Sequence, residues 1–216
     1  MGSDCFVQAL THRSANGKHN ERMEFLGDSV LGLVITNELY MQQPKASEGY
    51  LSRLRASLVN ENTLAEIANE LSLGDFLRLG AGELKSGGFR RKSILSDTLE
   101  AVIGSVFLEK GMDAATSFVL KIYTNRFEKL PSEDDLKDPK SRLQEILQSR
   151  GYDIPQYELV STTGDAHRQV FTAECTIKSL EIHTKGMAGS RRKAEQQSAH
   201  NAYDIVFDKI STKKKG

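Results

Sequence analysis

The segment NERMEFLGDSVL, residues 20–31, places three carboxylates along one stripe of an otherwise apolar helix. At about 100° per residue, Glu21, Glu24 and Asp28 fall within a sector of roughly 60°. The other side of the helix is apolar and carries Leu26, Val30, Leu33 and Val34. Carboxylates so close to a hydrophobic core need a positive partner, and the nearby Arg22 points away from the stripe. A metal cation is therefore a more natural partner than a side chain.

A second acidic pair lies further along the chain, in the apolar stretch SILSDTLEAVIGSVFLEKG. Asp97 and Glu100 stand three residues apart and share one face of a helix. If the two helices pack side by side, Glu24, Asp28, Asp97 and Glu100 form one cluster of oxygen ligands. Such a cluster suits Mg²⁺ or Mn²⁺ and not zinc, because no Cys or His stands at ligand spacing nearby. From spacing alone the alternative stays open that both pairs are solvated surface.

Composition narrows the class of protein. The chain has 216 residues, 38% of them hydrophobic, which is enough for one or two domains with real cores. No apolar run approaches the roughly eighteen residues of a membrane span, so we expect no membrane partner. The start, MGSDCFVQAL, lacks the basic and apolar regions of a secretory signal. Cys5 and Cys175 stand alone without motif spacing, which fits a reducing compartment and indicates a cytoplasmic protein.

A short acidic segment divides the chain. Residues 130–137, LPSEDDLK, combine a proline with acidic residues and lack apolar periodicity, so we interpret them as a linker. Before the linker, residues 1–129 show helical periodicity nearly throughout. After it, residues 138–210 form a second domain and residues 211–216 a basic tail. The net charge is zero overall, but the part from residue 138 onward has 13 Lys+Arg against 10 Asp+Glu.

Two helices and a loop are predicted between the acidic pairs. Ser47 caps a helix that ends near Asn60, and a second helix follows with its apolar face at Leu64, Ile67, Ala68 and Leu71. The glycine-rich stretch GAGELKSGGFRRKS, residues 80–93, is predicted as a loop. It lacks the G-x-x-x-x-G-K-[ST] spacing of a phosphate-binding loop, so no organic cofactor is indicated. The loop carries three basic residues, Arg90, Arg91 and Lys92. Two interpretations stay open for them: contact with a polyanion, or a solvated surface.

The pattern changes after the linker. A short amphipathic helix is predicted in DPKSRLQEILQSRG, and three strands follow in QYELVSTTG, RQVFTAECTIKS and LEIHTKGMAG. A last helix is predicted in SRRKAEQQSAHNAYDIVFDKI, with Ser190 as its N-cap. Three cations occupy the first turn of that helix: Arg191, Arg192 and Lys193. They oppose the helix dipole and cost stability unless an anion binds there, and phosphate is the obvious anion.

Several blocks together resemble the bacterial ribonuclease III family. They are QALTHRS at residues 8–14, NERMEFLGDS at 20–29, GELKSGGFRRKSILSDTLEA at 82–101, and DPKSRLQE and GSRRKAEQ downstream. The resemblance runs over nearly the whole chain. It implies a two-domain fold, an all-α endonuclease domain followed by an α-β-β-β-α double-stranded RNA-binding domain. Family members usually carry a longer segment before QALTHRS, so the nuclease domain is expected to be shortened at its N-terminus.

The resemblance also implies an activity for the first domain. The four carboxylates Glu24, Asp28, Asp97 and Glu100 hold Mg²⁺, for which Mn²⁺ substitutes, and Asp28 and Glu100 are the indispensable catalytic residues. The implied reaction is metal-dependent hydrolysis of double-stranded RNA to 5′-phosphate and 3′-hydroxyl ends with short 3′ overhangs, in rRNA maturation and mRNA decay. The implied assembly is a homodimer. Glu21 and Glu48 match further family acids with supporting roles in RNA engagement. For Glu48 the alternative stays open that it is a first-turn acid that favours the helix dipole.

For the second domain the resemblance implies contacts with the RNA duplex. Three residues of its first helix and one histidine in the turn after the first strand are expected to face the minor groove: Ser141, Gln144, Gln148 and His167. Arg191, Arg192 and Lys193 are expected to bind phosphates. The chain departs from the usual domain pattern at Glu195, where a basic residue is common.

Two other functions are compatible with parts of the sequence. One is an RNA-binding adaptor with a degenerate nuclease domain, although all four acids are present. The other is a di-iron helical bundle, which needs Glu-x-x-His ligand pairs. The five histidines of the chain supply none of these pairs.

Overall fold

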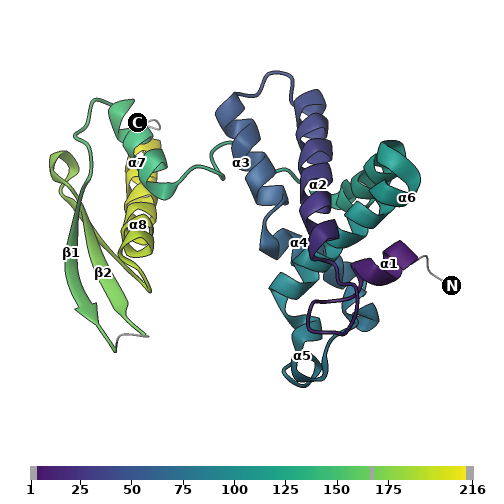
Figure 1. The fold of residues 1–216 in the computed structure, drawn as a ribbon. Helices are drawn as coiled ribbons and strands as arrows, with labels where there is room; N and C mark the ends of the chain where they lie inside the picture. The colour runs from purple at the N-terminus through teal and green to yellow at the C-terminus, as the bar shows by residue number, and fades with distance from the viewer. Residues whose placement is uncertain (1–3, 166–167, 213–216) are drawn as a thin grey trace. The chain divides into compact units, whose positions relative to one another are not determined.

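The chain folds into two units, Met1–Pro131 and Ser132–Gly216. The structure is a computed structural model that describes residues 4–165 and 168–212 (Figure 1). The first unit is helical, and its helices are α1 (Asp4–Ala9), α2 (Glu21–Gln42), α3 (Glu48–Leu58), α4 (Glu61–Glu70), α5 (Ala81–Lys85) and α6 (Lys92–Phe127). Among the described residues, no helix has the length and hydrophobicity that a membrane-spanning segment needs.

Helices α2 and α6 form the centre of the first unit and lie side by side (Figure 1). Their shared core contains buried aliphatic residues from both helices: Val30, Leu31, Val34 and Ile35 from α2, and Leu95, Leu99, Val102 and Ile103 from α6. Two glycines bring the helix backbones together. A Cβ atom at Gly27 would overlap the carbonyl oxygen of Glu100, and one at Gly104 would overlap the carbonyl oxygen of Met23. The absence of these side chains sets how closely the two acid-bearing helices approach.

Helix α6 is interrupted in its second half. Gly111 has φ 80° and ψ −177°, a conformation that residues with a side chain rarely adopt, so the chain bends there. The acid-bearing part, with Asp97 and Glu100, lies before this bend.

Three local expectations for the first unit are tested by the structure. Ser47 caps α3 as predicted, because its side chain accepts a hydrogen bond from the backbone N–H of Tyr50. Leu33, expected on the inner side of α2, is instead 60% exposed. The predicted loop of residues 80–93 is more ordered than expected, because it contains α5 and a 3₁₀ turn, Gly88–Arg90, before α6 begins.

The second unit has the predicted order of one helix, three strands and one helix. Its elements are α7 (Pro139–Gln148), β1 (Gln156–Thr163), β2 (Val170–Ile177), β3 (Ile182–Ala188) and α8 (Arg191–Thr212). The strands form an antiparallel sheet in the order β1-β2-β3. The core consists mainly of side chains from α7, β2 and α8, among them Leu143, Leu147, Cys175, Ile177, Ala199, Tyr203 and Val206.

Both helices of the second unit begin with local caps. Asp138 accepts a hydrogen bond from the backbone N–H of Lys140, and Pro139 opens α7. At the start of α8 the backbone N–H of Lys193 lies 3.4 Å from Ser190 Oγ. Helix α8 packs closely on β3, because a Cβ atom at Gly186 would overlap backbone atoms of α8. These contacts hold the first turns of α7 and α8 in defined positions.

Candidate active site

Three of the four predicted acids meet in the structure. Helix α2 contributes Glu24, and α6 contributes Asp97 and Glu100. One carboxylate oxygen from each lies within 4.8 Å of the other two, and all three residues are half-buried. Within the described residues, neither histidine nor cysteine joins this group. The arrangement is an all-oxygen site, the donor set that Mg²⁺ and Mn²⁺ prefer.

Burial raises the pKa values of all three acids, and the charges of neighbouring acids add to the rise at Glu24 and Glu100. Burial is the largest cause of a rise in the pKa of Glu100 to about 8, and the charges of Asp28, Asp97 and Glu24 add to it. The pKa of Glu24 is also raised, first by burial and then by Asp97 and Glu21. Burial likewise raises the pKa of Asp97. A cation between these carboxylates would relieve both the burial cost and the repulsion.

Asp28, the fourth predicted ligand, lies at the edge of the cluster. It is exposed on α2, one turn after Glu24, and is not one of the three acids whose oxygens meet. Its charge nevertheless raises the pKa of Glu100 more than the charges of Asp97 and Glu24 do. Asp28 is therefore an exposed acid whose charge acts on Glu100.

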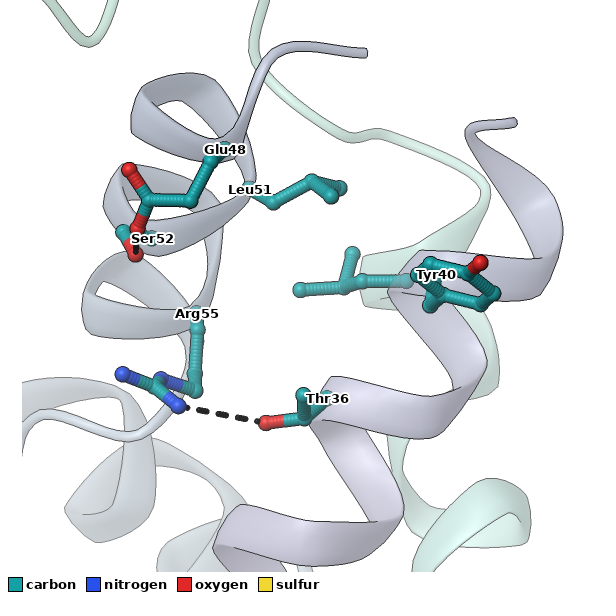
Figure 2. A pocket seen from close by; sticks show the side chains of 7 residues that line it. Thr36, Tyr40, Glu48, Leu51, Ser52 and Arg55 are labelled. Carbon is teal, nitrogen blue, oxygen red and sulfur yellow. Dashed lines mark hydrogen bonds between the residues drawn. The ribbon is translucent and has the colours of Figure 1, made fainter. Parts of the chain in front are cut away.

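The two supporting acids lie in different places. Glu21 lines the same cavity as Glu24 and Asp97, and Arg13 donates a hydrogen bond to it at 3.2 Å. Glu48 lines another pocket, between α3 and α2, with Arg55 and Tyr40 (Figure 2). Within one chain the structure thus brings Glu21, but not Glu48, to the cavity of the acids.

A cavity of about 700 Å³ opens beside Glu24 and Asp97. Its other walls carry hydrogen-bond donors: His12, Arg13, Asn20 and Arg91. Arg22 is the one basic neighbour that helical spacing indicates, and the structure adds another, because Arg13 reaches Glu21 from the segment before α2. Helical spacing could not reveal this neighbour, and the one signal in the sequence was the position of THRS within a family block.

The basic residues at the start of α6 have separate partners. Arg91 lines the cavity and pairs with Glu83 at 3.1 Å. Arg90 lies over the ring of Phe89, and Lys92 donates to Asn62 Oδ1 at 2.7 Å. Of the three, only Arg91 is placed beside the acids.

The predicted RNA-facing residues of the second unit are exposed. Ser141, Gln144 and Gln148 lie at three- and four-residue spacing on α7, so they share one face. Arg191, Arg192 and Lys193 form the exposed first turn of α8. His167 lies outside the described residues.

Glu195 connects the two helices of this surface. It is buried and accepts hydrogen bonds from Lys140 of α7 at 2.5 Å and from Arg191 of α8 at 2.8 Å. These two bonds, that from Lys140 first, lower the pKa of the Glu195 carboxyl. The adjacent Gln196 donates to the Asp138 carboxylate. The acid in place of a usual base thus holds the first turn of α7 against that of α8.

Both units of the chain are similar to known protein families. One family model, described as Ribonuclease-III-like, matches residues 3–127, and a second, described as Double-stranded RNA binding motif, matches residues 139–206. The Ribonuclease 3 of Buchnera aphidicola subsp. Baizongia pistaciae is 54% identical over 199 residues, covering 92% of this chain and 88% of that protein. The Ribonuclease 3 of Proteus mirabilis is 54% identical over 200 residues, covering 93% and 88%.

A solved structure resembles the first unit. It is the nuclease domain of ribonuclease III from Campylobacter jejuni, described for structural flexibility in the region involved in dimer formation. It is 45% identical, has a TM-score of 0.57, and the match covers 60% of this chain and 92% of that one. The acidic cluster lies within the first matched range and the exposed faces of α7 and α8 within the second. The chain belongs to the ribonuclease III family of endoribonucleases that act on double-stranded RNA.

Proposed function

We propose that this chain is a Mg²⁺-dependent endoribonuclease that leaves 5′-phosphate and 3′-hydroxyl ends with short 3′ overhangs. The observation that carries this proposal is the meeting of Glu24, Asp97 and Glu100, with their oxygens within 4.8 Å of one another. In this proposal residues 1–129 are the nuclease domain, 130–137 a linker and 138–210 the RNA-binding domain. The RNAs cut would include rRNA precursors and mRNA.

The site fits a hard divalent cation. Its donors are all carboxylate oxygens, and burial, with the charges of neighbouring acids, raises the pKa of Glu100 to about 8, an unfavourable state that a cation would relieve. Glu24, Asp97 and Glu100 would hold the ion, with Asp28 beside them; Mn²⁺ would substitute for Mg²⁺. When bound, the ion supplies Lewis acidity at a phosphate oxygen and an acidified water.

The residues of the chain have two tasks in the hydrolysis. Glu24, Asp97 and Glu100 are partly buried, so their carboxylates are held in fixed positions. The site therefore need not reorganise when charge develops in the reaction. Asp28, exposed beside Glu100, faces the solvent side from which water and RNA arrive. In the reaction, a water oxygen bonds to phosphorus, the bond from phosphorus to the 3′ oxygen breaks, and the leaving oxygen takes up a proton. The products are therefore a 5′-phosphate and a 3′-hydroxyl.

A homodimer would let two such sites cut both strands. Exposed apolar side chains lie along one stripe of α2: Phe25 at 78%, Leu33 at 60% and Tyr40 at 67% exposure. At about 100° per residue they fall within a sector of roughly 80°. An apolar stripe of this kind supports an isologous interface, and two sites related by a two-fold axis would cut opposite strands with a stagger.

The second unit would deliver the duplex to these sites. The proposed minor-groove contacts are Ser141, Gln144 and Gln148. The first turn of α8 would contact the phosphates of the RNA backbone. His167 has the proposed role of a further minor-groove contact, and Glu48 that of a supporting acid in RNA engagement. Cys5 and Cys175 are both free thiols, which supports a cytoplasmic enzyme.

The test uses a long, perfectly paired RNA duplex, with Mg²⁺ or with EDTA. The parent chain is compared with Asp28→Asn and Glu100→Gln. Cleavage to short duplexes only with the metal, lost in both variants while duplex binding persists, is the expected result. Binding without cleavage in the parent under Mg²⁺ and Mn²⁺ would instead identify an RNA-binding adaptor.

A further inference from the structure

We propose that His12, together with Asn20 and Arg13, forms a phosphodiester-binding wall of the active-site cavity, with His12 Nε2–H as its central donor. This inference rests on the proposed nuclease function and adds positioning residues to it. The acids on α2 and α6 would bind the metal. The donors beside them would bind a non-bridging oxygen of the RNA strand.

The hydrogen bonds around His12 place its proton. The backbone N–H of Ser14 donates to His12 Nδ1 at 3.1 Å. Ser14 Oγ accepts a hydrogen bond from the backbone N–H of Gly80 at 2.9 Å and lies 2.8 Å from the same Nδ1. The hydroxyl proton of Ser14 is therefore free to point at Nδ1, which becomes an acceptor. A neutral ring with Nδ1 as acceptor carries its proton on Nε2.

His12 thus presents a donor to the cavity that it lines. The cavity wall formed by His12 is close to the acids, because His12 lines the same cavity as Glu24 and Asp97. A phosphate oxygen at Nε2 would therefore lie near the metal ligands.

A second donor in this wall has no partner. Asn20 is 2% exposed and lines the cavity, and its Nδ2 makes no hydrogen bond with a described residue. It is the N-cap residue of α2, but its side chain makes no cap hydrogen bond. A buried amide N–H without an acceptor is unfavourable, so it is a group that an oxygen of a ligand would satisfy.

The remaining donors have little to hold them away from a ligand. Arg13 pairs with Glu21, but its side chain is 71% exposed, and exposed pairs of this kind contribute little stability. Helix α6 begins in the same cavity at Ser93 and Ile94, and its N-cap residue Arg91 provides no side-chain cap. Uncapped first-turn N–H groups favour an anion. All these donors are of the kind that a phosphodiester accepts from.

The test compares two substitutions of His12. They separate the contact of Nδ1 with Ser14 from the hydrogen-bond donor at Nε2. His12→Asn keeps an acceptor near the position of Nδ1 for the Ser14 N–H, but it lacks a group at the position of Nε2. His12→Gln places an N–H near the position of Nε2. The exposed His183→Asn serves as a matched control in the second unit. Each full-length variant is measured in duplex cleavage with Mg²⁺ and in duplex binding with Ca²⁺ in place of Mg²⁺.

We expect His12→Asn to lower kcat/KM and duplex affinity by about tenfold or more, the loss of one hydrogen bond to a charged group. His12→Gln should keep most of both, and thermal unfolding should be unchanged in His12→Asn, which keeps the contact with Ser14. Equal kcat/KM and equal duplex affinity in His12→Asn and His12→Gln would overturn the inference. A residue that acts only through its contact with Ser14 would give no advantage to His12→Gln. A parent chain that binds the duplex but does not cleave it would overturn the proposed function alone. The duplex affinities of His12→Asn and His12→Gln would still test the inference.

Discussion

Gly27 of α2 lies directly against the backbone of Glu100 on α6, so closely that a Cβ atom at residue 27 would overlap the Glu100 carbonyl oxygen. The residue without a side chain is therefore in contact with the acid whose pKa is raised to about 8. Glu24, one turn earlier on α2, joins the same cluster. The close crossing of the helices is what brings acids from two distant segments to one site.

Gly27→Ala is expected to damage both stability and activity. The added methyl group must push α6 away at Glu100, and such overpacking costs about 1–3 kcal/mol of unfolding free energy. Gly32→Ala is the matched control on the same helix, because nothing lies within 4 Å of a Cβ atom there. That control should be neutral or stabilising by about 0.5–1 kcal/mol. Urea unfolding followed by circular dichroism, with cleavage rates alongside, checks both; equal effects of the two substitutions would contradict the packing argument.

The pKa of Glu100 predicts how pH changes stability and metal binding. In the metal-free fold the pKa is raised from 4.5 to about 8, so the folded state keeps a proton that the unfolded state loses. The folded state binds more protons in this window, and this group's contribution to stability falls as pH rises from about 4.5 to about 8. Metal binding must displace the proton, so the metal-induced rise in Tm should grow with pH up to about 8.

Thermal unfolding with and without Mg²⁺, at about pH 6 and about pH 8.5, measures this effect. The control is Glu100→Gln, which cannot ionise. Without metal, it should be more stable relative to the parent at the higher pH, and its Tm should respond little to Mg²⁺. A metal response in the parent that is independent of pH would contradict the assignment of Glu100 as a ligand.

The pairing of Glu195 predicts unequal roles for two neighbouring arginines. Arg191 donates a hydrogen bond to Glu195, and the Glu195 carboxylate offsets the charge of Arg191. Arg192 makes no ion pair with a described residue. Arg192→Ala should therefore weaken duplex binding more than Arg191→Ala. It should also reduce the slope of log affinity against log salt by about 1, the change for one lost phosphate contact. Fluorescence anisotropy over a salt series tests this, and an equal loss of slope in both variants would count against it.

The exposed stripe on α2 predicts the position of the dimer interface. Phe25→Glu should convert a dimer to a monomer, because burying a carboxylate in an apolar interface is costly. Met41→Glu is the matched control, an exposed apolar residue on the same helix about 160° away from Phe25. Light scattering after size-exclusion chromatography measures the mass. A dimer that survives Phe25→Glu, or one that Met41→Glu also disrupts, would place the interface elsewhere.

Local sequence patterns were enough to predict the helices, the strands and the chemistry of the acids. Caps, apolar periodicity and strand alternation act over a few residues, so they predicted Ser47 as the cap of α3, the three strands and the two helices of the second unit. The same local spacing predicted that Glu24 shares a helix face with Asp28, and Asp97 one with Glu100. Family blocks then joined these pairs into one expected site.

How these elements meet depends on long-range packing, which local patterns do not contain. Helical spacing cannot tell that Leu33 is exposed, because exposure depends on which neighbours cover α2. It cannot bring Arg13 and His12 to the acids, since they come from a segment outside both helices. It cannot tell that Glu24, Asp97 and Glu100 meet without Asp28, or that Gly27 lies against the backbone of α6. Local patterns end within a few turns, whereas a site is made by distant backbones that approach one another.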